Sequence, residues 1–81
     1  MIIWNGKKKV VTMSAKEMFE ELGYELETEN NWGLQYYNEE EDNEYFFNKE
    51  HKWVEVPKGA YDVIDLKVLK AINKQIEELG W

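Results

Sequence analysis

A helix-ending sequence occurs twice in this chain of 81 residues and constrains where its helices lie. Residues 20–24 read Glu-Glu-Leu-Gly-Tyr and residues 77–81 read Glu-Glu-Leu-Gly-Trp. A glycine in the left-handed conformation commonly ends a helix, and the residue after it folds back onto the last turn. Both stretches therefore predict a helix end. Two matches of five residues do not make a structural repeat.

The first helix has an equally clear start at Ser14. Ser14 and Glu17 form a capping-box pattern, in which each side chain accepts from the backbone amide of the other residue. Met13 and Met18 occupy the positions of a hydrophobic staple around it. The pattern predicts a helix over residues 15–22. Its apolar face consists of Ala15, Met18, Phe19 and Leu22.

The last helix begins at Asp65, a residue type that accepts from the first free amides of a helix. Lysines lie on its outer face, and Gly80 ends it. Its apolar stripe consists of Leu66, Leu69, Ile72, Ile76 and Leu79.

Between the helices the pattern changes to strict alternation, which is typical of strands with one buried face. We predict four strands, over residues 24–29, 32–37, 45–47 and 53–56, connected by short polar segments. Short connections favour an antiparallel meander.

The N-terminal residues carry a turn signal of their own. Asn5-Gly6 is typical of a tight hairpin turn and predicts a β-hairpin over residues 1–11. A loose N-terminal arm is the alternative. We therefore expect one domain over residues 1–81, with residues 1–13 as an appended hairpin or arm. The fold class is α+β: a hairpin, a short helix, a four-stranded antiparallel meander and a C-terminal helix, with both helices on one sheet face.

Negative charge is concentrated in one part of the chain. Residues 17–48 contain eleven acids and no Lys, Arg or His, and the whole chain has a net charge of −7. Such a surface repels nucleic acid and attracts basic partners. The chain also lacks Arg, the residue best suited to binding phosphate. We therefore expect no direct nucleic-acid binding.

We predict that the acidic residues form a partner-binding surface with an aromatic side chain beside them. Glutamates at alternate positions of the first strand would project from one face about 6.6 Å apart, since a strand rises roughly 3.3 Å per residue. The predicted surface consists of Glu25, Glu27, Glu29, Glu39, Glu40, Glu41, Asp42 and Tyr37. In the pair Phe46-Phe47 one ring must also face outward. A solubilising sheet face is the alternative.

The sequence contains few of the residues that catalysis, metal binding or membrane insertion would require. Ser14 is the only serine and His51 the only histidine, and Ser14 already caps a helix. There is no Cys, and residues 39–44 lack the central glycine of an EF-hand loop. No apolar run approaches the roughly 18 residues of a membrane span. We predict a cytoplasmic, non-catalytic protein without metal or cofactor.

Two stretches resemble small proteins of phages and prophages of low-GC Gram-positive bacteria. They are residues 15–24 and 71–81, about a quarter of the chain, and the second is the more specific. Those proteins are mostly of unassigned function, so the resemblance implies a bacterial host cell as the setting and transfers no functional residue.

Two main hypotheses follow. In the first, a phage or mobile-element protein binds a host protein with a basic surface and inhibits a nucleic-acid-handling enzyme by charge mimicry. In the second, the chain is a self-associating accessory domain whose extra aromatic residues bury against another copy. A small enzyme using carboxylates is a third hypothesis, which would require a concave pocket. Monomer and homodimer remain open.

Overall fold

The computed structural model describes residues 13–57 and 64–81. The hairpin predicted over residues 1–11 lies outside the described residues. Six elements follow in chain order: α1 (Ala15–Glu21), β1 (Glu25–Glu29), β2 (Gly33–Asn38), β3 (Asn43–Asn48), β4 (Trp53–Glu55) and α2 (Leu66–Leu79).

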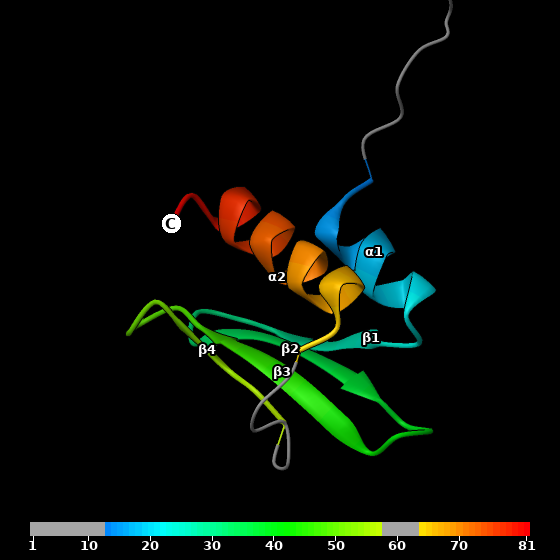
Figure 1. Cartoon of the computed structure of the whole chain (residues 1–81). Helices are drawn as coiled ribbons and strands as arrows, with labels where there is room; N and C mark the ends of the chain where they lie inside the picture. The colour runs from blue at the N-terminus through cyan, green and yellow to red at the C-terminus, as the bar shows by residue number, and fades with distance from the viewer. Residues whose placement is uncertain (1–12, 58–63) are drawn as a thin grey trace, which may run out of the picture.

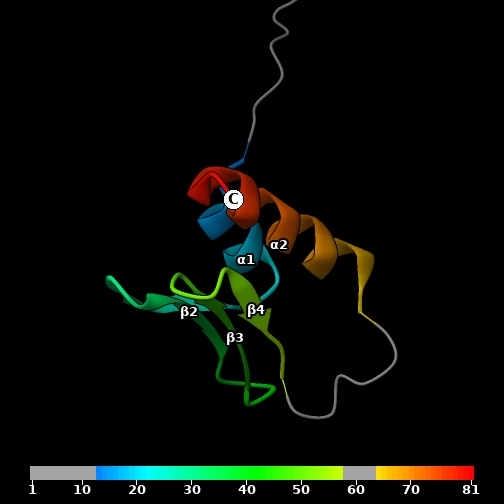
Figure 2. The same ribbon diagram turned by 90° about the vertical axis from the view of Figure 1, so that its left-hand side faces the viewer.

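The strands form one antiparallel meander, in the order β1-β2-β3-β4. Figures 1 and 2 show α1 and α2 side by side over one face of this sheet, with no other described element over the opposite face. The predicted α+β architecture, with a four-stranded meander and both helices on one sheet face, is confirmed.

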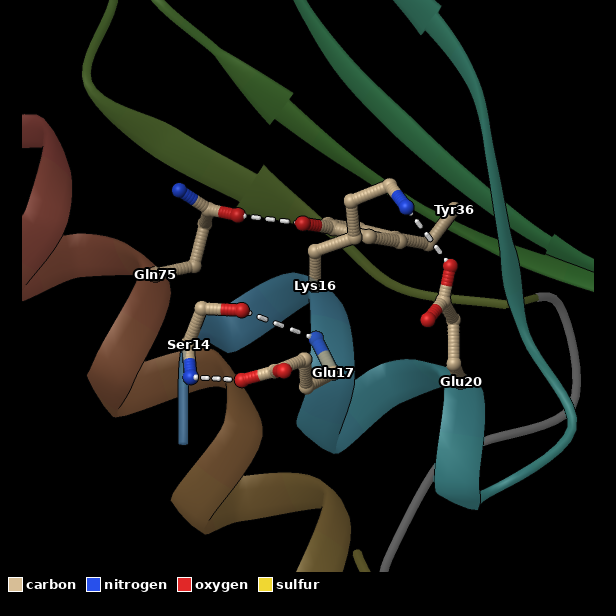
Figure 3. Close-up of polar contacts among 6 residues, drawn as sticks. All are labelled: Ser14, Lys16, Glu17, Glu20, Tyr36 and Gln75. Atoms are coloured by element: carbon tan, nitrogen blue, oxygen red, sulfur yellow. Dashed lines mark hydrogen bonds and ion pairs between the residues drawn. The ribbon is translucent and has the colours of Figure 1, made fainter. Parts of the chain in front are cut away.

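Both helices begin and end as their sequences predict. Ser14 Oγ accepts from the Glu17 amide at 3.1 Å, and the Glu17 carboxylate accepts from the Ser14 amide at 2.9 Å (Figure 3). Tyr24 N donates to Phe19 O, and Trp81 N donates to Ile76 O. The helix α1 has only seven residues. Helices this short are marginal in isolation, so these caps and the packing of its apolar face both stabilise it.

The core lies between the helices and the sheet and is largely aromatic. Phe19 of α1 is fully buried and stacks on Tyr36 of β2 with ring centroids 4.0 Å apart. The Phe47 ring meets both of these rings nearly edge-on, at centroid distances of 6.1 Å. The Tyr36 hydroxyl donates to the Gln75 side-chain oxygen of α2, which ties the sheet to the helix layer (Figure 3).

The strand boundaries differ from the prediction in the region of the acidic loop. The third strand was expected over residues 45–47, but β3 begins at Asn43, which pairs with Asn38 at the end of β2. The connection is therefore only residues 39–42. The buried Asn38 side chain stabilises this turn by accepting from the Glu41 amide at 3.0 Å. Trp32, expected in the second strand, lies in the preceding turn.

Candidate partner-binding surface

We call the sheet face turned away from α1 and α2 the outer face. Tyr36 and Phe47 are buried against the helices, so their neighbours Tyr37 and Phe46 lie on the outer face and are half-buried. A Cβ atom on Gly33 would lie only 2.6 Å from the Phe46 ring, which shows that this ring lies across Gly33. Of the pair Phe46-Phe47, Phe46 is therefore the outward ring beside Tyr37.

The predicted row of three glutamates on β1 does not form. Glu25 pairs with Tyr37 and Leu26 with Tyr36, but a register shift follows, and Glu29 pairs with Leu34. Leu34 is a buried core residue, so Glu29 lies on the helix side of the sheet edge. One extra residue in a strand reverses the faces of all residues after it. The equal spacing on one face expected for Glu25, Glu27 and Glu29 is therefore wrong.

Glu25 and Glu27 instead meet the turn that follows β2. They line a concavity of about 370 Å³ at the end of the sheet. This concavity brings together most of the predicted surface, and its lining includes Glu25, Glu27, Tyr37, Glu39 and Glu40. Gly23 and the buried Asn38 complete its wall.

The other two predicted acids of the turn have different surroundings. Asp42 has a left-handed backbone (φ 52°) and accepts from the Tyr37 hydroxyl at 2.8 Å. This hydrogen bond is the main reason that the pKa of Tyr37 is raised. Glu41 contributes to raising the pKa values of Tyr24 and Tyr45 by its negative charge, after the larger effect of their burial. Glu41 does not line the concavity.

A second concavity, of about 330 Å³, was missed at the sequence level. It lies over β3 and β4 on the outer face, and its lining includes Asp42, Glu44, Phe46, Glu55 and Val56. Glu44 and Phe46 are two residues apart and so share a face. This alternation in the sequence could have identified Glu44 as a neighbour of Phe46. Glu55 joins the site only because β4 pairs with β3.

Three acids of this surface are oriented by neutral donors. Glu44 accepts from the Gln35 amide at 2.9 Å, and Glu55 accepts from the Trp53 indole at 3.0 Å, as Asp42 does from Tyr37. We call this set the acidic–aromatic surface: Glu25, Glu27, Tyr37, Glu39, Glu40, Asp42, Glu44, Phe46 and Glu55.

No member of the acidic–aromatic surface forms an ion pair with a lysine within residues 13–57 and 64–81. The ion pairs there join Lys16 to Glu20, Lys74 to Glu77 and, when the histidine is protonated, His51 to Glu50. None of these involves a member of the surface.

The opposite end of the sheet carries two exposed tryptophans. Trp32 is 68% exposed and Trp53 is 52% exposed. The Trp53 ring stacks on His51 with centroids 4.3 Å apart. Lys49 N donates to Trp32 O at 2.9 Å, so the turn between β1 and β2 is adjacent to the turn between β3 and β4.

In the part of the chain that the structure describes, no group of three or more His, Asp or Glu side chains is arranged to hold a metal ion. Among the same residues no helix has the length and apolar character needed to span a membrane. Comparison with protein-family models, curated proteins and solved structures found no match to this chain.

Proposed function

We propose that this chain is a non-catalytic protein that binds a basic surface of a host protein through its acidic–aromatic surface. The observation that supports this is the gathering of its carboxylates in two concavities, at the end and on the outer face of the sheet, without an ion pair to a lysine among the described residues. Two concavities beside Tyr37 and Phe46 give the surface a shape into which partner side chains can fit, in addition to its charge.

The physical basis is electrostatic attraction with aromatic anchoring. Lysine and arginine side chains of a partner would gain ion pairs with oriented carboxylates, while Tyr37 and Phe46 supply rigid apolar area and faces for cation–π contact. Because most of these carboxylates are exposed, salt would screen the attraction strongly.

The sharpest form of the proposal is inhibition of a nucleic-acid-handling host enzyme. Such enzymes bind phosphates in lysine- and arginine-lined channels. An anionic protein surface that occupies such a channel would compete with the nucleic acid. The phage or mobile-element setting belongs to the same proposal and rests on the sequence resemblance of residues 15–24 and 71–81.

An affinity capture from bacterial lysate tests the proposal, with a charge-matched control. The test variant is E25Q/E27Q/E39Q/E40Q, and the control E20Q/E21Q/E50Q/E77Q removes the same charge from elsewhere. We expect the wild type and the control to retain a basic protein at low salt, and the test variant to lose it. The captured protein should release its nucleic acid when this chain is added. Equal capture by both variants would contradict the proposal.

A self-associating accessory domain is the second candidate, favoured by the exposed Trp32 and Trp53. Large exposed aromatic residues are typical of interaction sites. Sedimentation across a concentration series distinguishes this function, since a dimer that dissociates in W32S/W53S would support it. A monomer at all concentrations would exclude it.

A further inference from the structure

A second surface, with apolar side chains and lysines, lies on the helix layer. Together α1 and α2 form a groove with an apolar floor, where concavities of about 370 and 150 Å³ meet. Met13, Met18 and Leu22 supply the floor. Lys67, Lys70 and Lys74 supply one rim. We call this the helix groove. The helix groove lies on the helix layer and shares no lining residue with the two concavities of the acidic–aromatic surface.

We infer that the helix groove binds an acidic amphipathic helix of a partner protein. Two packed helices leave a valley between them into which a third helix fits by ordinary ridge-and-groove packing. Ala15 N donates to the Glu78 carboxylate at 2.8 Å, which fixes α1 against α2 and so holds the valley in place. The half-buried Met13 and Met18 are flexible and polarisable, a property suited to binding an apolar ridge.

The charges of the groove specify the sign of the partner. Lys67, Lys70 and Lys74 follow one another along α2 over about 10 Å, given a rise of 1.5 Å per residue. Lys74 already pairs with Glu77 at 3.0 Å, whereas Lys67 and Lys70 make no ion pair within the described residues. Glu21 is the remaining acid of the lining. The α2 rim is therefore positive in a protein of net charge −7, and it favours carboxylates on the ligand.

The apolar character continues beyond the two concavities along α2. Leu66 is 62% exposed and lies one turn before Lys70, and Leu69 is 37% exposed. An exposed leucine at each of these positions gives the partner helix additional apolar contact. The inference does not depend on the proposed function, because no member of the acidic–aromatic surface lines the helix groove.

The test uses a synthetic peptide of about 14 residues, four helical turns, with leucines on one face and glutamates elsewhere. Two further peptides carry glutamine or lysine in place of the glutamates. The readout is the NMR signals of the methionine methyl groups in the full chain. We expect the acidic peptide alone to shift the Met13 and Met18 signals saturably. K67E/K70E should weaken its binding at least tenfold, whereas the charge-matched control K49E/K52E should not.

Three outcomes would overturn the inference. Equal binding of the glutamine peptide would mean that the groove is merely apolar. Methionine shifts that depend on protein concentration without peptide would indicate a second copy as the occupant. If no peptide shifts the Met13 and Met18 signals but the substitution Trp4→Ser does, the occupant is the chain's own N-terminal segment.

Discussion

At the scale of single residues, the contact between Tyr36 and Gln75 joins the two layers of the fold. Both side chains are buried, at 1% and 5% exposure. The Tyr36 ring stacks on Phe19 while its hydroxyl donates to Gln75. One residue thus serves the apolar core and a polar contact that fixes α2 over β2.

Replacing Tyr36 by Phe should lower the free energy of unfolding by about 1–3 kcal/mol, because the Gln75 oxygen would be left buried without its donor. The ring stacking would remain. Urea denaturation measures the loss. In the double variant Y36F/Q75L neither group is left unpaired, so its loss should be smaller than the sum of the two single losses. Simple additivity would show that the hydrogen bond contributes nothing.

Buried tyrosines should also make stability fall at high pH. Burial is the main cause that raises the pKa values of Tyr24 and Tyr36 from 10.0 to about 12. The folded chain therefore holds these protons more tightly than the unfolded chain. The associated stability is fully present below pH 10.0 and is lost as the pH rises towards about 12. Urea midpoints across this range should decline less steeply for Y24F/Y36F than for the wild type.

At the scale of elements, the two helix ends are alike in backbone but differ in surroundings. Gly23 and Gly80 both have left-handed backbones, with φ of 94° and 77°. A Cβ atom on Gly80 would meet nothing within 4 Å, whereas one on Gly23 would lie 3.1 Å from the side-chain nitrogen Nδ2 of Asn38. The end of α2 at Gly80 is therefore open, whereas the end of α1 at Gly23 is packed against Asn38, beside the turn of the acidic–aromatic surface.

This difference predicts unequal effects of the same substitution. Gly80→Ala should destabilise the protein by about 1 kcal/mol, the strain of a left-handed alanine. Gly23→Ala adds a tight contact with Asn38, which is buried and hydrogen-bonded to Glu41, and should destabilise it more. Urea midpoints of the two variants provide the comparison. Equal losses of stability in the two variants would mean that the Asn38 side chain moves aside without cost.

At the scale of the whole molecule, an acidic surface and a lysine rim lie on different parts of the fold. The acidic–aromatic surface occupies one end and part of the outer face of the sheet, and the positive α2 rim lies on the helix layer. Carboxylates that lie together without lysines repel one another in the folded state. This repulsion lowers the stability of the folded chain.

Salt should therefore stabilise the wild type by screening this repulsion. In E25Q/E27Q/E39Q/E40Q the repulsion is smaller, so its free energy of unfolding should rise less with sodium chloride. The control E20Q/E21Q/E50Q/E77Q, which leaves these four acids in place, should respond to salt more nearly as the wild type does. Thermal denaturation at several salt concentrations measures the effect, and parallel responses of all three proteins would refute it.

Several features were predictable from the sequence because they depend on neighbouring residues. Ser14 and Glu17 form their capping box within one turn, and Gly23 and Gly80 end their helices through bonds to the preceding turn. Alternation likewise identified the strands, and short connections indicated their meander. The acidic character of the surface also followed from composition alone.

Other features were decided by pairing between distant segments. The irregularity in β1 moved Glu29 off the outer face, and only the register with β2 reveals it. Packing against α1 buried Phe47 and left Phe46 outward, and pairing of β4 with β3 brought Glu55 into the site. Local patterns fix backbone conformation because their hydrogen bonds span a few residues. Which side chains share a face depends on long-range register, which the tertiary structure alone determined.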